Sequence, residues 1–107
     1  MAYDAGLVER VRDSLAGIGR AATREKNVFG GRGFLASGST FAIVFDDELI
    51  VKLPRSEYDR CLAMPGVRPF APGGERPMTT WVVVSADAIA EDPELSEWLS
   101  LGLQAIL

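Results

Sequence analysis

The chain has 107 residues, of which 48% are hydrophobic and 24% are charged, and its net charge of −4 argues against general nucleic-acid binding. It contains no histidine and a single cysteine, Cys61, which excludes histidine-based catalysis, an intrachain disulfide and a cysteine-rich zinc site. We therefore expect one domain over residues 1–107, with no cofactor or metal. No segment has the pattern of a signal peptide or a membrane span, so we expect a cytoplasmic protein with no membrane partner.

The chain begins with a predicted helix over residues 4–18. Apolar residues recur there at helical spacing after Asp4, whose carboxylate suits a helix cap. Segment 23–29 alternates charged residues with Val28, which is typical of an edge strand rather than a helix. After a cluster of glycines, a strand pattern resumes at residues 34–36.

Two further strands follow at residues 40–45 and 48–53, because both segments are rich in β-branched and aromatic side chains. Asp46 and Asp47 form the two-residue turn between them. Strands connected this closely along the chain predict an antiparallel meander.

The second half predicts a short helix at 56–63, a proline- and glycine-rich loop at 65–78 with at most a short strand, and a strand at 81–84. A closing helix at 93–106 starts at the Asp-Pro signal. The order α-β3-α-β2-α predicts an α+β fold with an antiparallel sheet.

The segment Phe29-Gly30-Gly31-Arg32-Gly33-Phe34 is the most pointed local motif. It lacks the ending of a phosphate-binding loop, so a tightly bent hairpin is the favoured interpretation. Adjacent glycines before an aromatic strand predict a positive φ at Gly30 or Gly31.

The remaining reactive residue types have structural explanations. The acidic run Asp46-Asp47-Glu48 fits turn chemistry better than a metal site, since neighbouring strand residues point to opposite faces. Cys61 lies on the apolar side of its short helix and is expected to be buried. Trp81 and Trp98 are expected in the core.

Charge is unevenly distributed. Residues 77–107 contain five acidic residues and no Lys or Arg, whereas residues 20–34 contain four basic residues and one acidic residue. Two interpretations of this charge distribution are open: solvent-exposed faces of opposite charge, or a local basic surface that binds an acidic partner. The candidate interaction residues are Arg24, Lys26, Arg32, Lys52 and Arg55.

The end of the last helix is apolar nearly all round, because Leu101 and Leu103 lie away from its main apolar face. Such a helix end needs burial on more than one side. We therefore predict a homodimer with Leu101, Leu103 and Leu107 as candidate interface residues. The alternative is that the first helix covers them within the same chain.

Short glycine, aromatic and proline blocks recur along the chain in a recognisable order and spacing. They are Phe29-Gly30-Gly31, Gly38-Ser39-Thr40-Phe41, Leu49-Ile50-Val51-Lys52, Pro69-Phe70 and Pro77-Met78-Thr79-Thr80-Trp81. In these blocks the chain resembles the N-terminal domain of the TfoX/Sxy family of competence regulators, as a single-domain member. The resemblance implies the same α+β order, similar in layout to secretion chaperones, and transfers no catalytic residues.

The favoured function is a non-enzymatic regulatory or protein-interaction module, with the transcription machinery or a regulator as partner. One alternative is direct DNA binding through residues 20–34 with Lys52 and Arg55. The stretch from Thr40 to Pro54 is also similar to the MmcQ/YjbR DNA-binding-like family. The other is a small-ligand or enzymatic pocket near Gly30–Phe34 and Trp81.

Overall fold

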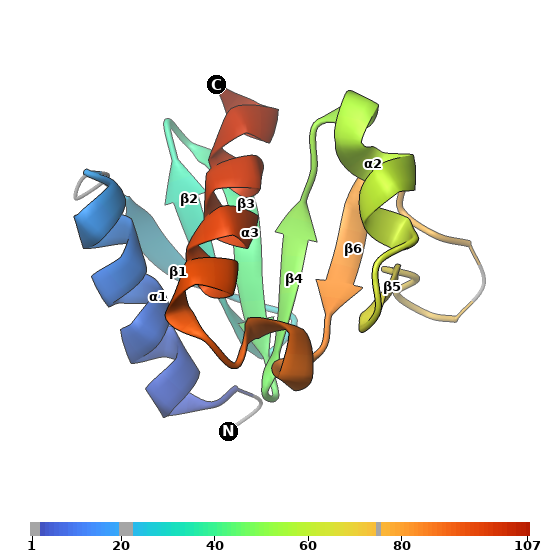
Figure 1. The fold of residues 1–107 in the computed structure, drawn as a ribbon. Coiled ribbons are helices and arrows are strands. Elements are labelled where there is room, and N and C mark those ends of the chain that lie inside the picture. Colours follow the sequence, from blue (N-terminus) through green and yellow to red (C-terminus); the bar gives the residue numbers. More distant parts are fainter. Residues whose placement is uncertain (1–2, 20–22, 75) are drawn as a thin grey trace.

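A six-stranded antiparallel sheet carries helices on one of its faces in the computed structural model, which describes residues 3–19, 23–74 and 76–107 (Figure 1). The elements in chain order are α1 (Ala5–Ile18), β1 (Arg24–Val28), β2 (Gly31–Ala36), β3 (Ser39–Phe45), β4 (Glu48–Lys52), α2 (Arg55–Leu62), β5 (Val67–Pro69), β6 (Trp81–Val84), the 3₁₀ helix η1 (Ala86–Ile89) and α3 (Asp92–Ile106). The strands lie side by side in the order β1-β2-β3-β4-β6-β5. The predicted α+β class with an antiparallel sheet is confirmed.

The strand count before α2 differs from the expected order. Four strands precede α2 rather than three, because a turn at Phe29-Gly30 divides the segment 23–36 into β1 and β2, and Gly31 and Gly33 belong to β2. Gly33 pairs with Lys26 of β1 and with Ile43 of β3. The basic segment is confirmed as a strand at the sheet edge, since β1 pairs with β2 alone.

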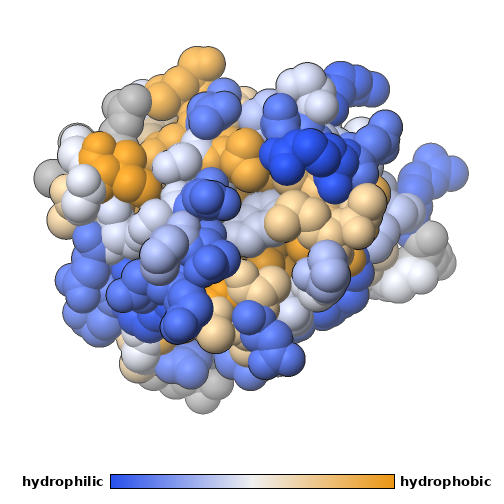
Figure 2. All heavy atoms as spheres, viewed as in Figure 1, coloured by the Kyte–Doolittle hydropathy of each residue, from blue (hydrophilic) through white to orange (hydrophobic). Residues whose placement is uncertain are grey.

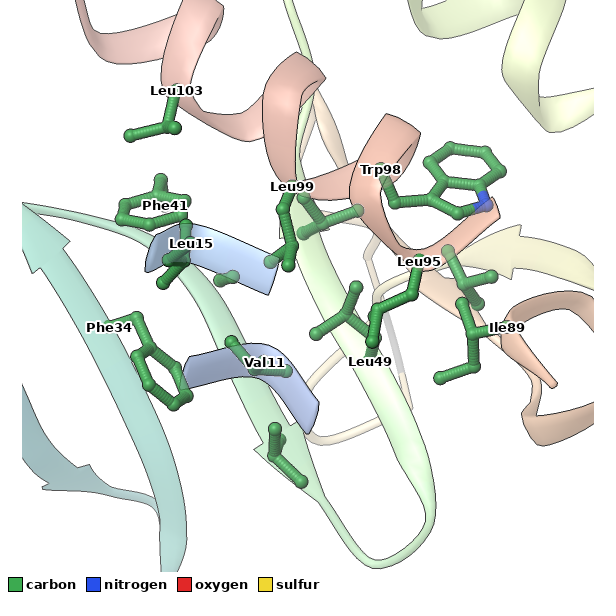
Figure 3. Packing of buried hydrophobic residues seen from close by; sticks show 14 of the residues in the cluster. Val11, Leu15, Phe34, Phe41, Leu49, Ile89, Leu95, Trp98, Leu99 and Leu103 are labelled. Carbon is green, nitrogen blue, oxygen red and sulfur yellow. The ribbon is translucent and has the colours of Figure 1, made fainter. Parts of the chain in front are cut away.

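The helices α1, α2 and α3 lie in front of the sheet in Figure 1, and the main core fills the space between the two layers. Figure 3 shows Leu15 of α1 and Leu99 of α3 pointing into the same cluster as Phe34 and Phe41 of the sheet. A register shift between β2 and β3 leaves Phe41 as an extra residue opposite the Phe34–Leu35 step. Phe41 therefore joins Ala42 in the core, although the two are neighbours in the strand.

The helix α3 approaches the sheet most closely at Gly102. A Cβ atom built there would lie 3.0 Å from the Phe41 ring and 3.0 Å from Val51. The absence of a side chain is what allows this distance of approach. Gly17 of α1 has no atom within 4 Å of a Cβ built in the same way, so it offers a matched contrast.

The helix starts partly follow the sequence signals. Asp4 caps α1 as predicted, accepting hydrogen bonds from the backbone N–H groups of Gly6 at 2.7 Å and Leu7 at 3.2 Å. The helix α2 starts at Arg55, one residue before its predicted start, and directly after Pro54 with no side-chain cap. Asp92 is the first residue of α3 and forms an ion pair with Arg10 of α1 at 3.1 Å, which joins the two helices.

The candidate interface at the end of α3 is corrected for one residue. Leu103 is 4% exposed and belongs to the core cluster with Leu15 and Phe41 (Figure 3), because α1 packs beside α3. Its side chain is not available to a second subunit. Leu101 is partly buried against the same core, while Leu107 is 63% exposed. For Leu101 and Leu107, a subunit contact stays a prediction.

Seen from the helix side, the surface mixes hydrophilic and hydrophobic residues (Figure 2). Among residues 3–19, 23–74 and 76–107, no helix combines the length and apolar character that crossing a membrane requires.

Candidate functional site

None of the described helices packs on the second face of the sheet, called here the open face. Because side chains alternate along a strand, each strand contributes every second residue to it. A separate apolar cluster forms its centre: Ile43, Ile50 and Val83 are buried, and Val28, Phe45, Phe70 and Trp81 pack around them partly exposed. Trp98 lies in the main core as predicted, whereas Trp81 is partly buried against the separate cluster on the open face. Its place in the alternation of β6 explains this, since Val82 and Val84 occupy the opposite face.

The two sides of the open face meet through an aromatic pair. Phe29, in the turn between β1 and β2, lies with its ring centroid 6.2 Å from that of Phe70, which follows β5. Phe70 is held in place by its N–H, which donates to the Trp81 carbonyl at 3.2 Å, and by its carbonyl, which accepts from the Met78 N–H at 2.8 Å. The β1–β2 hairpin and the β5–β6 loop therefore converge over the same part of the sheet.

The glycines of β2 permit this convergence. A Cβ at Gly31 would lie 2.5 Å from the Val44 carbonyl oxygen, and a Cβ at Gly33 would lie 2.6 Å from a methyl carbon of Val28. Any side chain at either position would collide with its neighbours. The motif is a bent hairpin and not a phosphate loop, and Gly30 has a φ of 83°, which confirms the predicted positive φ.

Between the two converging segments lies a hollow of about 170 Å³, called here the apolar hollow. Its lining residues are Lys26, Val28, Phe29, Thr40, Ile43, Phe70, Met78 and Trp81. Of the residues named for a pocket from the sequence, Gly30–Phe34 and Trp81, Trp81 lines this hollow, whereas Phe34 points to the other face and is fully buried in the main core. Loop residues Phe70 and Met78 were not predicted to belong to a site, because contacts across a long loop leave no local sequence pattern.

A larger hollow of about 430 Å³ adjoins it and shares Phe70. Arg68 and Glu48 line this second hollow, and the Arg68 guanidinium donates two hydrogen bonds of 2.8 Å to the Glu48 carboxylate. This contact lowers the pKa of Glu48 from its usual value, although partial burial opposes the shift. The carboxylate of Glu48 is therefore ionised and already engaged at neutral pH.

The structure brings three of the five candidate basic residues to the open face. Arg24 and Lys26 are exposed on β1, opposite Leu35 and Gly33 of β2, and Lys52 on β4 is opposite Trp81. Within the part of the chain that the structure describes, none of the three forms an ion pair. Of these cations, Lys26 lines the apolar hollow, and Lys52 lies opposite Trp81, which also lines it.

The other two candidates lie elsewhere. Because side chains alternate along β2, Arg32 points to the helix-covered face. Its guanidinium donates hydrogen bonds there to the Glu25 carboxylate at 2.9 Å and to the Asn27 side-chain oxygen at 3.1 Å. Glu25 also accepts two hydrogen bonds from Arg12 of α1, at 2.7 and 2.8 Å. The pKa of Glu25 is lowered to about 2. The hydrogen bonds from Arg12 lower it most and the hydrogen bond from Arg32 lowers it further, whereas partial burial raises it. Arg55 is exposed at the start of α2.

The predicted structural roles of the remaining candidates agree with the structure. Cys61 is fully buried in the main core, and burial raises the pKa of its thiol, so it has the setting of a core side chain rather than a nucleophile. Asp46 and Asp47 form the two-residue turn between β3 and β4. Across the described ranges, no group of three acidic or cysteine side chains is arranged to hold a metal ion.

An antiparallel sheet with all three helices on one face, and an open face bordered by basic residues, defines an α+β domain whose free surface is a sheet. The sequence matches the TfoX N-terminal domain over residues 13–106, and the chain belongs to this family. It is a family of regulatory-type domains and not of enzymes. Searches among curated proteins and among solved structures gave no match to the chain.

Proposed function

We propose that this domain is a cytoplasmic regulatory module that acts by binding another protein, and that the open face is its binding surface. The partner is an acidic segment of the transcription machinery or of one of its regulators. The observation that carries the proposal is the combination on one surface of partly exposed aromatic residues and three cations that form no ion pair with any described residue.

The apolar part of the surface supports binding because proteins seldom leave grouped aromatic side chains in water without a use for them. Phe29 is 65% exposed and Met78 is 43% exposed, both beside the partly exposed Trp81. Aromatic residues dominate the binding free energy of protein interfaces when a partner covers them.

The charges support an acidic partner. Among the described residues, Arg24, Lys26 and Lys52 form no ion pair with a carboxylate. Asp46 and Glu48 line the neighbouring hollow, and Glu48 is already paired with Arg68. Electrostatic complementarity of this kind raises association rates and suppresses wrong partners.

Nucleic acid fits this surface less well. Arg32 was expected to extend the basic segment, but it faces the helices and its charge is balanced by Glu25. Three cations on a protein with a net charge of −4 provide a weak site for a phosphate backbone.

The proposal is tested by affinity purification from the cells that make the protein, with the wild type, Lys26→Glu and Arg60→Glu as baits. Arg60 is an exposed residue of α2, so Arg60→Glu changes the total charge equally but away from the open face. We expect partner proteins that bind the wild type and Arg60→Glu and are lost from Lys26→Glu. A partner set that Lys26→Glu retains in full would contradict the proposal.

DNA binding is measured in parallel by fluorescence anisotropy with labelled duplex DNA at low salt. No binding is expected. Binding that weakens steeply with salt and is lost in Lys26→Glu would make the open face a nucleic-acid interface instead.

A further inference from the structure

Phe29 occupies a backbone position that does not suit it. The turn between β1 and β2 has two residues, Phe29 with a φ of 55° and Gly30 with a φ of 83°. Two-residue hairpin turns with positive φ at both positions strongly prefer Asn-Gly, because a bulky side chain is strained in the left-handed region. Stability of the turn would therefore favour Asn at position 29.

The next turn of the same meander provides the comparison. Ser37 and Gly38 join β2 to β3 with φ values of 52° and 80°, nearly the same backbone, and the residue in the strained position is small and polar. Phe29 is 65% exposed, and the aromatic ring paired with it is that of Phe70. Thr80, immediately before Trp81, is a second strained residue beside the hollow, with a φ of 74°. Backbone strain of this kind concentrates at functional sites.

On this basis, and resting on the proposed function, we propose that the apolar hollow receives one aromatic side chain of the partner protein, from a segment whose neighbouring residues are acidic. Phe29 is retained at a strained position because its ring forms one wall of this hollow.

The size of the hollow limits what enters. A volume of about 170 Å³ is close to the ~150 Å³ of an engineered apolar cavity that binds benzene. The hollow therefore accommodates one ring and its immediate attachment.

The lining favours an aromatic ring. The rings of Phe29 and Phe70 are tilted by 52° and form one side, while Trp81 and Ile43 lie along the others. A third ring would pack against them in offset or edge-to-face geometry, which adds to the gain from burial. Met78 is unbranched and polarisable, so it adapts to rings of different shape.

The lining also favours a protein side chain over a nucleobase. Six of the eight lining residues are apolar, and Thr40 and Lys26 provide the polar groups. A base buried here would leave several hydrogen-bonding groups unpaired, which costs binding free energy, whereas a Phe or Leu side chain has none to lose.

The cations define the sequence on either side of the anchor. Lys26 lines the hollow itself. Arg24 lies two residues before Lys26 on β1 and so on the same face, and Lys52 lies opposite Trp81. Carboxylates next to an inserted ring would lie within reach of these three charges, so acidic residues flank the aromatic anchor.

The test is selection from a library of short random peptides displayed on phage, against the immobilised wild-type domain. We expect enriched peptides to share one Trp, Phe or Tyr with Asp or Glu on both sides. A representative peptide is then labelled and titrated against purified variants.

The decisive variants are Phe29→Asn and Ser37→Asn. Each places Asn-Gly in a two-residue turn, so both proteins fold, but only Phe29→Asn removes a wall of the hollow. We expect Phe29→Asn to weaken peptide binding at least tenfold and Ser37→Asn to leave it unchanged. Replacing the peptide's aromatic residue by Ala should weaken binding by a similar factor.

The outcomes distinguish the inference from the proposed function. Enriched peptides that lack an aromatic-acidic pattern, yet lose binding to Lys26→Glu, would overturn the inference and leave the open face as a binding surface. No enrichment, or peptides that bind Lys26→Glu and Phe29→Asn as well as the wild type, would overturn both. Peptide binding that depends on the acidic residues alone would place the contact on the basic border and refute the hollow as an anchor site.

Discussion

The two faces of the sheet are built from the same strands but are completed differently. On the helix-covered face, side chains such as Phe41, Leu49 and Val51 are fully buried by α1, α2 and α3. On the open face, Trp81 is only partly covered and Phe29 is mostly exposed. The contrast indicates that one face provides most of the folding stability, while the other carries strain and exposed aromatic area that folding alone does not require.

Substitutions in the main core should have the largest effect on stability. Leu99→Ala removes a fully buried side chain between α3 and the sheet, and such truncations cost about 2–5 kcal/mol. Met78→Ala, on the border of the open face, should cost less than about 1 kcal/mol because that side chain is 43% exposed. Urea denaturation of the two variants measures both values. Equal losses would contradict the division of roles between the faces.

The close approach of α3 to the sheet predicts the next largest effect. Gly102→Val forces atoms into the contact with Phe41 and Val51 and should lower the free energy of unfolding by about 1–3 kcal/mol. Gly17→Ala is the control, since nothing lies near its Cβ and helix propensity should raise stability by about 0.5–1 kcal/mol. Thermal denaturation of both would show opposite shifts. A stabilised Gly102→Val would mean that α3 is not held at this distance.

The ion-pair network of Arg12, Glu25 and Arg32 predicts a pH dependence. The folded-state pKa of Glu25, about 2, lies below its ordinary value of 4.5, so the carboxylate stabilises the fold above about pH 4.5. This contribution is lost as the pH falls from about 4.5 toward 2. Glu25→Gln should cost about 1 kcal/mol or less at pH 7, and its stability should fall less than that of the wild type on acidification. Parallel pH profiles for the two proteins would disprove the role of the network.

The smallest predicted change in stability concerns the two hairpin turns. Phe29→Asn and Ser37→Asn should each raise the free energy of unfolding by a few tenths of a kcal/mol, because Asn tolerates positive φ better than Phe or Ser. Chemical denaturation compares them. A clear loss of stability in Phe29→Asn alone would show that Phe29 is there to hold the fold rather than to bind.

The helices and most strands could be predicted from sequence because their signals are local. The cap at Asp4, the edge strand before Gly30 and the apolar stripe of α3 each occupy a few neighbouring residues. The two-residue turn at Asp46-Asp47 was also recognisable.

The open face was harder to predict, because it depends on how distant segments meet. The side that Trp81 faces depends on its register with β4, and the pairing of Phe29 with Phe70 brings together a turn and a loop that lie far apart in the sequence. The burial of Leu103 likewise depends on α1 packing beside α3. No local pattern encodes these contacts.

The open face, and not the helix-covered face, is the proposed functional surface of the domain. An NMR titration of the ¹⁵N-labelled domain with a selected aromatic-acidic peptide tests this directly, following backbone amides and the Trp81 and Trp98 indole signals. We expect the largest shifts on the Trp81 indole and on amides around Lys26, Phe29 and Thr40, with the Trp98 indole little changed. Shifts concentrated on α1 and α3, with an unchanged Trp81 signal, would contradict it.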